Sequence, residues 1–196
     1  MFNHKLLSFS LFVTVLFSIS AMGAVPPSLK FTIGMSDPAA HYYHVELRCE
    51  GYVKEKLNFK LPAWTPGYYW IMDFAKNVVR FNARTGDGKA LIWDKVDKNN
   101  WEVNTGAADV VIISYDVFAN THSVADPFID ESHAYISTAG VFMHLAGELN
   151  APAEIVLQPY QKWSTVSTGL EPVAGKAYTY TASNFDELYD SPVYIG

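Results

Sequence analysis

The chain has 196 residues, of which 49% are hydrophobic and 17% charged, and its formal net charge at pH 7 is -6. This length allows one domain of ordinary size, and this composition excludes an intrinsically disordered chain. The acidic balance excludes the basic surface that nucleic-acid binding requires, and the single cysteine excludes an intramolecular disulfide framework.

Residues 1–23 predict a secretory signal peptide. Lys5 supplies its positive charge, and the apolar run from Leu6 to Ile19 is shorter than the roughly 20 residues that span a bilayer as a helix. Because small residues precede the expected cleavage site after Gly23, we expect a secreted or periplasmic protein with no stable membrane anchor. An uncleaved N-terminal anchor is the alternative. Residues 24–196 are then expected to form a single β-domain.

Alternation of apolar and polar residues predicts three half-buried antiparallel strands near the start of this domain. The alternation continues to Cys49, which we therefore expect to be a small buried hydrophobe and not a reactive thiol. The apolar members of the three strands are Leu29, Phe31, Ile33 and Met35; Tyr43, Val45 and Leu47; and Leu57, Phe59 and Leu61.

Further strands are predicted at short intervals along the rest of the chain. Residues 110–118 form the longest β-branched run, which predicts a central, well-buried strand. Ser183 and Asn184, followed by acidic residues, predict one short helix. The pattern therefore predicts an all-β fold, an antiparallel β-sandwich or saddle with one short C-terminal helical turn. The other predicted strands are residues 78–84, 91–96, 101–103, 141–145, 154–158 and 178–182, with a hairpin connection at 97–100.

No complete catalytic motif is present in the sequence. The chain has no H-E-x-x-H, no C-x-x-C, no G-x-S-x-G and no glycine-rich phosphate loop. His41 and His44 are three residues apart, which on a strand places them on opposite faces. The densest group of potential metal ligands is interpreted as a solvated acidic loop, with a zinc site as the alternative. That group consists of His122, Asp126, Asp130, Glu131 and His133.

Residues 61–77 form a segment with an unusual density of aromatic side chains. Two prolines restrict its backbone, and Gly67 permits a tight turn. One interpretation is a stiffened loop that presents rings and polar groups to a ligand. The alternative is a structural corner whose rings plug one end of a sandwich. The large aromatic residues are Trp64, Tyr68, Tyr69, Trp70 and Phe74, followed by the polar residue Asn77.

The same segment and three others resemble a known signature. Residues 61–68 and 73–77, L-P-A-W-T-P-G-Y and D-F-A-K-N, resemble the pattern L-P-x-W-x-P-G-x-Y…D-F-A-x-N. Residues 93–101, 130–135 and 186–196 resemble W-x-K-V-D-K-N-x-W, D-x-x-H-A-F and D-E-L-x-D-S-P-x-x-x-G. These patterns are those of the glycyl aminopeptidase family, which are secreted or periplasmic zinc metallopeptidases related to thermolysin-like enzymes.

The resemblance implies that the chain is the non-catalytic N-terminal β-domain of such a peptidase. In that family a zinc-binding catalytic domain follows, commonly with a PDZ-type domain after it, so zinc and its ligands are expected there and none in this chain. The resemblance implies no catalytic residue here but one wall of a peptide-substrate cleft. The residues expected to line it are Tyr68, Tyr69, Asp73, Asn77 and His133.

The sequence departs from the family pattern at one position, and two other functions are alternatives to the peptidase domain. Met72 stands where family members often carry Arg, so a guanidinium that could pair with Asp73 or a substrate carboxylate is absent. A free-standing extracytoplasmic module could bind a peptide or a carbohydrate through the same aromatic loop. A structural β-domain could use an exposed apolar patch to dock a partner protein.

Overall fold

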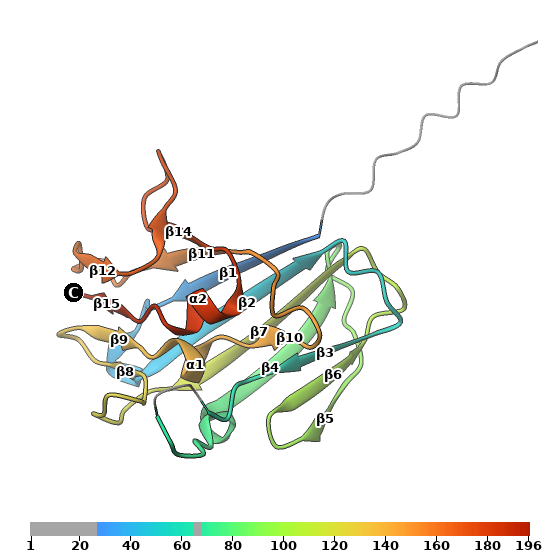
Figure 1. Ribbon diagram of the computed structural model, residues 1–196, viewed down its shortest axis with the longest axis horizontal. Helices are drawn as coiled ribbons and strands as arrows, with labels where there is room; N and C mark the ends of the chain where they lie inside the picture. Colours follow the sequence, from blue (N-terminus) through green and yellow to red (C-terminus); the bar gives the residue numbers. More distant parts are fainter. Residues whose placement is uncertain (1–26, 65–67) are drawn as a thin grey trace, which may run out of the picture.

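Three β-sheets form the part of the chain that the computed structural model describes, residues 27–64 and 68–196 (Figure 1). The predicted signal peptide lies outside these residues. Within the two described ranges, no helix combines the length and the apolar character that crossing a membrane requires.

The largest sheet has seven strands and provides one face of the hydrophobic core. Its neighbours pair antiparallel except at its centre, where β1 and β11 run parallel with Phe31 opposite Ile155. This large sheet is therefore mixed, within an all-β fold of the predicted class. In spatial order its strands are β13 (Glu171–Pro172), β14 (Thr179–Ala182), β11 (Ala153–Gln158), β1 (Ser28–Gly34), β2 (Tyr42–Glu50), β7 (Val110–Phe118) and β4 (Val78–Thr85).

Two four-stranded sheets accompany the large sheet. We call them the second and third sheets, and Figure 1 shows them at opposite sides of the molecule. In spatial order, the second sheet contains β10 (His144–Leu145), β3 (Lys56–Lys60), β6 (Asn100–Asn104) and β5 (Trp93–Asp97). The third sheet contains β12 (Val166–Thr168), β15 (Val193–Ile195), β9 (Ala134–Ile136) and β8 (Phe128–Ile129).

Short helical turns connect the strands. The predicted C-terminal helix is α2 (Phe185–Tyr189), where the side chain of Asn184 accepts a hydrogen bond from the Glu187 amide and caps the first turn. The others are α1 (Thr138–Val141) and two 3₁₀ turns, η1 (Pro38–Ala40) and η2 (Phe74–Asn77). The sequence predicted only α2.

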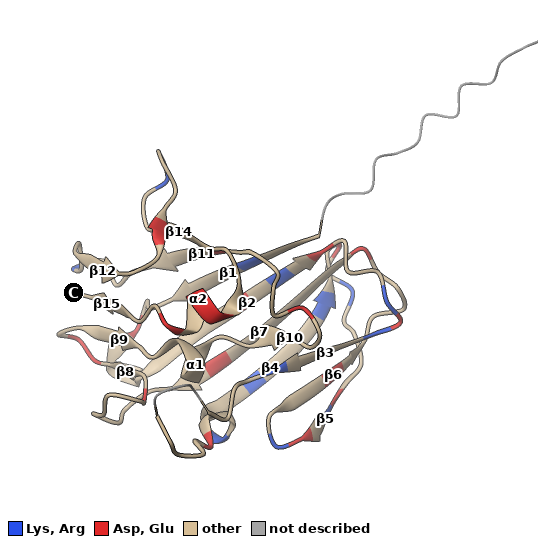
Figure 2. Ribbon diagram, in the orientation of Figure 1, with Lys and Arg blue, Asp and Glu red and all other residues tan. Residues whose placement is uncertain are grey.

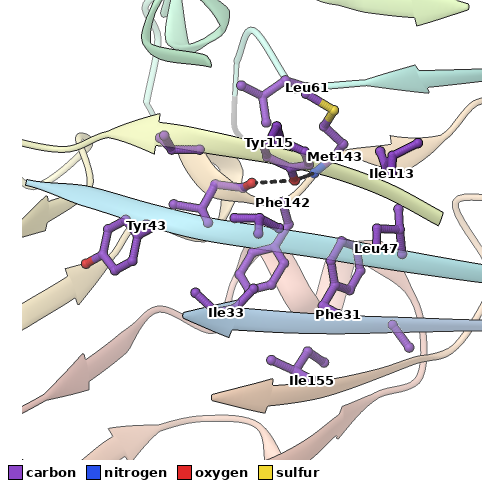
Figure 3. Close-up of a cluster of buried hydrophobic side chains, with 14 of the residues drawn as sticks. Phe31, Ile33, Tyr43, Leu47, Leu61, Ile113, Tyr115, Phe142, Met143 and Ile155 are labelled. Atoms are coloured by element: carbon purple, nitrogen blue, oxygen red, sulfur yellow. Dashed lines mark hydrogen bonds between the residues drawn. The ribbon is translucent and has the colours of Figure 1, made fainter. Parts of the chain in front are cut away.

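The core lies between the inner face of the large sheet and the elements that cover it (Figure 3). Towards the second sheet, the Phe81 ring on β4 stacks on Trp101 of β6 at 5.7 Å between centroids. Towards the helical turns, the Phe31 ring on β1 meets Phe142 edge-on at 4.9 Å. The predicted apolar residues of the first three strands are all buried, as is Cys49, and burial raises the pKa of its thiol.

Most predicted strands match the structure, and one is wrong for most of its length. The predicted strand at 110–118 has the bounds of β7, which is flanked by β2 and β4. The predicted strand at 141–145 instead begins at the last residue of α1 and contains only the two residues of β10. In α1, a Cβ added to Gly140 would lie 2.9 Å from Pro127 Cδ, so the small residue permits this close packing.

Candidate functional site

The aromatic loop, residues 61–74, is anchored at its base and exposed at its tip. Residues 65–67, with the predicted turn at Gly67, lie outside the described residues. The Met72 amide donates to the Ala63 carbonyl at 2.7 Å and closes the base, while Leu61 and Phe74 are buried at its two ends. At the tip, Tyr69 is 98% exposed and Trp70 is 71% exposed. The Tyr69 and Trp70 rings therefore face solvent, whereas the Phe74 ring packs into the core.

Tyr68 borders a hollow of about 170 Å³, which we call the tyrosine hollow. The Tyr135 hydroxyl on β9 donates to the Val124 carbonyl at 2.9 Å, and Ser137 Oγ donates to the Ala125 carbonyl at 2.5 Å. These bonds fix the segment 124–125 against the third sheet. The hollow is lined by Tyr68, Phe74, Val124, Ala125, Tyr135, Ser137, Thr138, Ala139, Tyr189, Asp190 and Pro192.

The tyrosine hollow is a recess with both polar and apolar walls and a charged rim. Burial raises the pKa of Tyr189 well above its usual value, so that phenol stays neutral at physiological pH. Thr138 Oγ1 donates to the Tyr189 carbonyl at 2.7 Å and joins α1 to α2. Asp190 follows α2 and is exposed, so a carboxylate is available beside the apolar walls. This arrangement suits binding of a side chain and an adjacent cation, and the Ser137 and Thr138 hydroxyls in its lining both donate to backbone carbonyls.

Asp73 and Asn77 lie at the two ends of η2, on the other side of the loop base. The Asp73 carboxylate forms an ion pair with the Lys98 ammonium at 3.3 Å, and Asn77, the last residue of η2, is half-buried. The Lys95 ammonium lies 3.5 Å from the Ala75 carbonyl. The turn η2 therefore contacts β5 and the connection between β5 and β6.

His133 lies apart from the other predicted site residues. It precedes β9, and its Nδ1 lies 2.8 Å from Ser132 Oγ. Hydrogen bonds, first from the Ser132 hydroxyl and then from backbone amides, lower the pKa of Asp130 beside it. The hollow that His133 borders, about 280 Å³, is lined by Thr165, Ser167, Tyr194, Ile195 and Gly196 and by no residue of the aromatic loop.

The possible metal ligands among the described residues do not form a site. The His122 ring stacks on Phe128 at 3.8 Å, and Asp126 accepts a hydrogen bond from Ser123. His44 instead contacts Asp116 on the large sheet, with Nδ1 2.6 Å from Oδ1. In residues 27–64 and 68–196, no three His, Cys, Asp or Glu side chains are arranged to hold an ion.

The segments that carry the sequence resemblance converge at η2. Tyr68, Tyr135 and Tyr189 come from three of these segments and border the tyrosine hollow. Lys98, from a fourth, pairs with Asp73. Sequence reasoning selected Tyr68 and Asp73 but missed Tyr135, Tyr189 and Lys98, although all three lie inside the segments that resemble the signature.

Comparisons with known proteins identify the family of the chain. The model of the family described as Peptidase M61 N-terminal domain matches residues 30–196. A crystal structure of an aminopeptidase N family protein from Idiomarina loihiensis is similar, with a TM-score of 0.78 and 25% sequence identity. The similarity covers 86% of this chain and 29% of that chain, so this chain spans less than a third of that protein's length. No curated protein sequence matches.

Proposed function

The chain belongs to the family of peptidase M61 N-terminal domains, and from this premise we propose that it forms one wall of the peptide-binding cleft of a secreted or periplasmic zinc aminopeptidase. A catalytic domain in the same polypeptide is the partner that this role requires. A PDZ-type domain after it would complete the arrangement that the sequence resemblance implies.

The exposed rings of the aromatic loop carry the proposal. Tyr69 and Trp70 present large apolar surfaces to solvent on a loop whose base is fixed by the Met72 to Ala63 hydrogen bond. Two large rings exposed to water contribute little to the stability of the isolated domain, because hydrophobic stabilisation requires burial. They gain free energy when a second domain or a substrate covers them.

The tyrosine hollow gives the wall a recess for substrate. A volume of about 170 Å³ accommodates a small side chain and not a whole peptide. Asp190 at its rim supplies a negative charge that attracts a substrate's α-ammonium group. Together they favour a peptide whose N-terminus lies beside α2.

The hydrolytic chemistry belongs outside the described residues. Zinc peptidases need three protein ligands, a metal-bound water and a general base, and residues 27–64 and 68–196 contain no cluster of three or more His, Cys, Asp or Glu side chains that could hold a metal ion. We therefore assign zinc and all reacting groups to the catalytic domain. The contribution of this chain is to bind and orient the peptide.

The test uses the natural polypeptide that contains this chain, assayed on peptides with an N-terminal Gly or Ala. Replacing both rings, with Tyr69→Ser and Trp70→Ser, should raise KM about tenfold and leave kcat within about twofold, because uniform binding is lost. The matched control is Val53→Ser, an exposed apolar residue outside the loop, which should change neither constant.

Two outcomes would contradict the proposal. An unchanged KM in the double variant would remove the loop from the cleft. A natural polypeptide without an H-E-x-x-H segment would leave the free-standing binding module as the function, in which case the same variants should weaken binding of a peptide or an oligosaccharide. The purified chain itself, supplied with zinc, should release no N-terminal Gly or Ala.

A further inference from the structure

A second hollow, of about 200 Å³, lies beside η2 and is surrounded by three lysines. We call it the lysine hollow; its lining residues are Asp73, Ala75, Lys76, Lys95 and Lys98. The turn η2 contributes to both hollows, because Phe74 borders the tyrosine hollow and its neighbours in the chain border the lysine hollow. Figure 2 shows acidic and basic segments close together at η2 and at the turn between β5 and β6, at the lower edge of the view.

Two contacts hold the Lys95 ammonium in place, one with an aromatic ring and one with a backbone carbonyl. It lies 4.5 Å above the centre of the Trp101 ring and 3.5 Å from the Ala75 carbonyl oxygen. Both contacts restrict the side chain, since a ring face and a carbonyl oxygen attract a cation from two directions. The group is therefore positioned in advance of any ligand, which lowers the entropy cost of binding.

The lysine hollow has more cationic than anionic groups on its walls. Its one carboxylate, that of Asp73, pairs with Lys98, whose side chain is 81% exposed. Among residues 27–64 and 68–196, Lys76 and Lys95 lie within ion-pair distance of no carboxylate. Asp97 is close in sequence, but its carboxylate accepts a hydrogen bond from the Lys98 amide and is not part of the lining.

We propose that the lysine hollow binds a carboxylate of the peptide substrate, either an acidic side chain or the free C-terminus of a short peptide. This inference rests on the proposed peptide cleft and adds a substrate class to it. Asp73 occupies Lys98 in the absence of substrate, so the ligand carboxylate and the Asp73 carboxylate compete for the same ammonium group. Lys95 and Lys76 provide the two charges that Asp73 does not neutralise.

The test is a titration of the purified protein, followed by the backbone amide NMR signals of residues 73–76 and 95–98. Three peptides of equal length serve as probes: a neutral amide, the same peptide with a free C-terminus, and the amide with one glutamate. At least one of the two anionic peptides should bind about fivefold more tightly than the neutral one, the effect of two exposed ion pairs. Whichever anionic peptide binds more tightly identifies the source of the carboxylate, a free C-terminus or a glutamate side chain.

Two variants with opposite expected effects make the assignment specific. Lys98→Gln should reduce the preference for the anionic peptide to about twofold, whereas Asp73→Asn should increase the affinity for it, because Lys98 is released. Lys176→Gln removes the same charge at a distant surface, where Lys176 pairs with Glu154, and should change nothing. Circular dichroism spectra confirm that each variant is folded.

Several results would overturn the inference. Equal affinity for all three peptides, or no binding of any of them, removes the carboxylate site from this protein. Equal binding of inorganic phosphate at the same amides shows a non-specific anion site. None of these results bears on the KM effect of the Tyr69 and Trp70 variants, so the proposed cleft can fail or stand independently.

Discussion

Tyr115 in the core and Tyr69 at the tip of the aromatic loop carry the same side chain in opposite surroundings. The Tyr115 ring is fully buried on β7, and its hydroxyl donates to the Val141 carbonyl at 2.8 Å and accepts from the Met143 amide at 3.1 Å (Figure 3). The Tyr69 ring is almost fully exposed. Aromatic content alone therefore does not distinguish packing from binding, whereas burial and satisfied hydrogen bonds do.

Charged side chains also differ in their surroundings: some form ion pairs within the domain and others do not. On the outer face of the large sheet, opposite charges pair between strands, as in Lys30 with Glu154 on the adjacent strands β1 and β11 at 2.8 Å and Arg84 with Glu46 across β7 at 2.8 Å. In the lysine hollow, Lys76 and Lys95 lack such partners among the described residues. The outer face of the large sheet thus neutralises its own charges, whereas the lysine hollow leaves positive charge that a ligand can neutralise.

The largest expected contrast is between a core ring and a loop ring. Phe31→Ala removes a buried side chain that packs against Phe142 and Phe185, and it should lower the free energy of unfolding by about 3–5 kcal/mol. Trp70→Ala should change it by less than about 0.5 kcal/mol, because the ring is exposed. Urea denaturation measures both. A loss above about 1 kcal/mol for Trp70→Ala would mean that the loop ring is part of the packing.

A smaller contrast concerns a single hydroxyl. Tyr115→Phe keeps the ring but leaves the Met143 amide and the Val141 carbonyl without their buried partner, and it should cost about 2 kcal/mol. Tyr69→Phe is the matched control and should cost nothing measurable. Equal stabilities of the two variants would show that the buried hydroxyl does not hold α1 against β7.

The strands could be predicted from the sequence where a pattern is local. Residues 110–118 form an uninterrupted β-branched run, and the structure gives β7 those bounds. The four residues of α1 are too few to show a helical period, and their conformation depends on tertiary contacts such as that between Thr138 and Tyr189. The parallel pairing of β1 with β11 joins segments more than a hundred residues apart, so no local pattern reports it.

The site was predictable only in part, for the same physical reason. Composition and prolines mark the aromatic loop, and in the structure Tyr68 and Asp73 border two separate hollows. Other lining residues include Tyr135 of β9, Tyr189 of α2 and Lys95 of β5, which only the tertiary fold brings to η2. His133, two residues before Tyr135, lies outside β9 and borders a different hollow, which the sequence pattern alone does not report.

The smallest expected effect concerns His144, a half-buried ring between the two extremes. Its Nδ1 lies 3.1 Å from the Tyr189 hydroxyl, and its ring meets Phe185 at 5.9 Å. Burial, and then the positive charge of Lys60, lower the pKa of His144 from 6.5 to about 4. Between these two pH values the unfolded chain binds a proton at His144 more readily than the folded chain does. The contribution of neutral His144 to the free energy of unfolding is therefore complete above pH 6.5 and is lost as the pH falls towards 4.

Because the ring is partly exposed, we expect this loss to be about 1–2 kcal/mol, less than the full shift implies. The measurement is urea denaturation of the protein and of His144→Gln at several pH values from 7 to about 4. The variant removes the titrating group, so its stability should fall less steeply over this interval, and carboxylates that titrate in both proteins cancel in the comparison. Identical slopes would show that the His144 ring is solvated and belongs with the exposed rings of the loop.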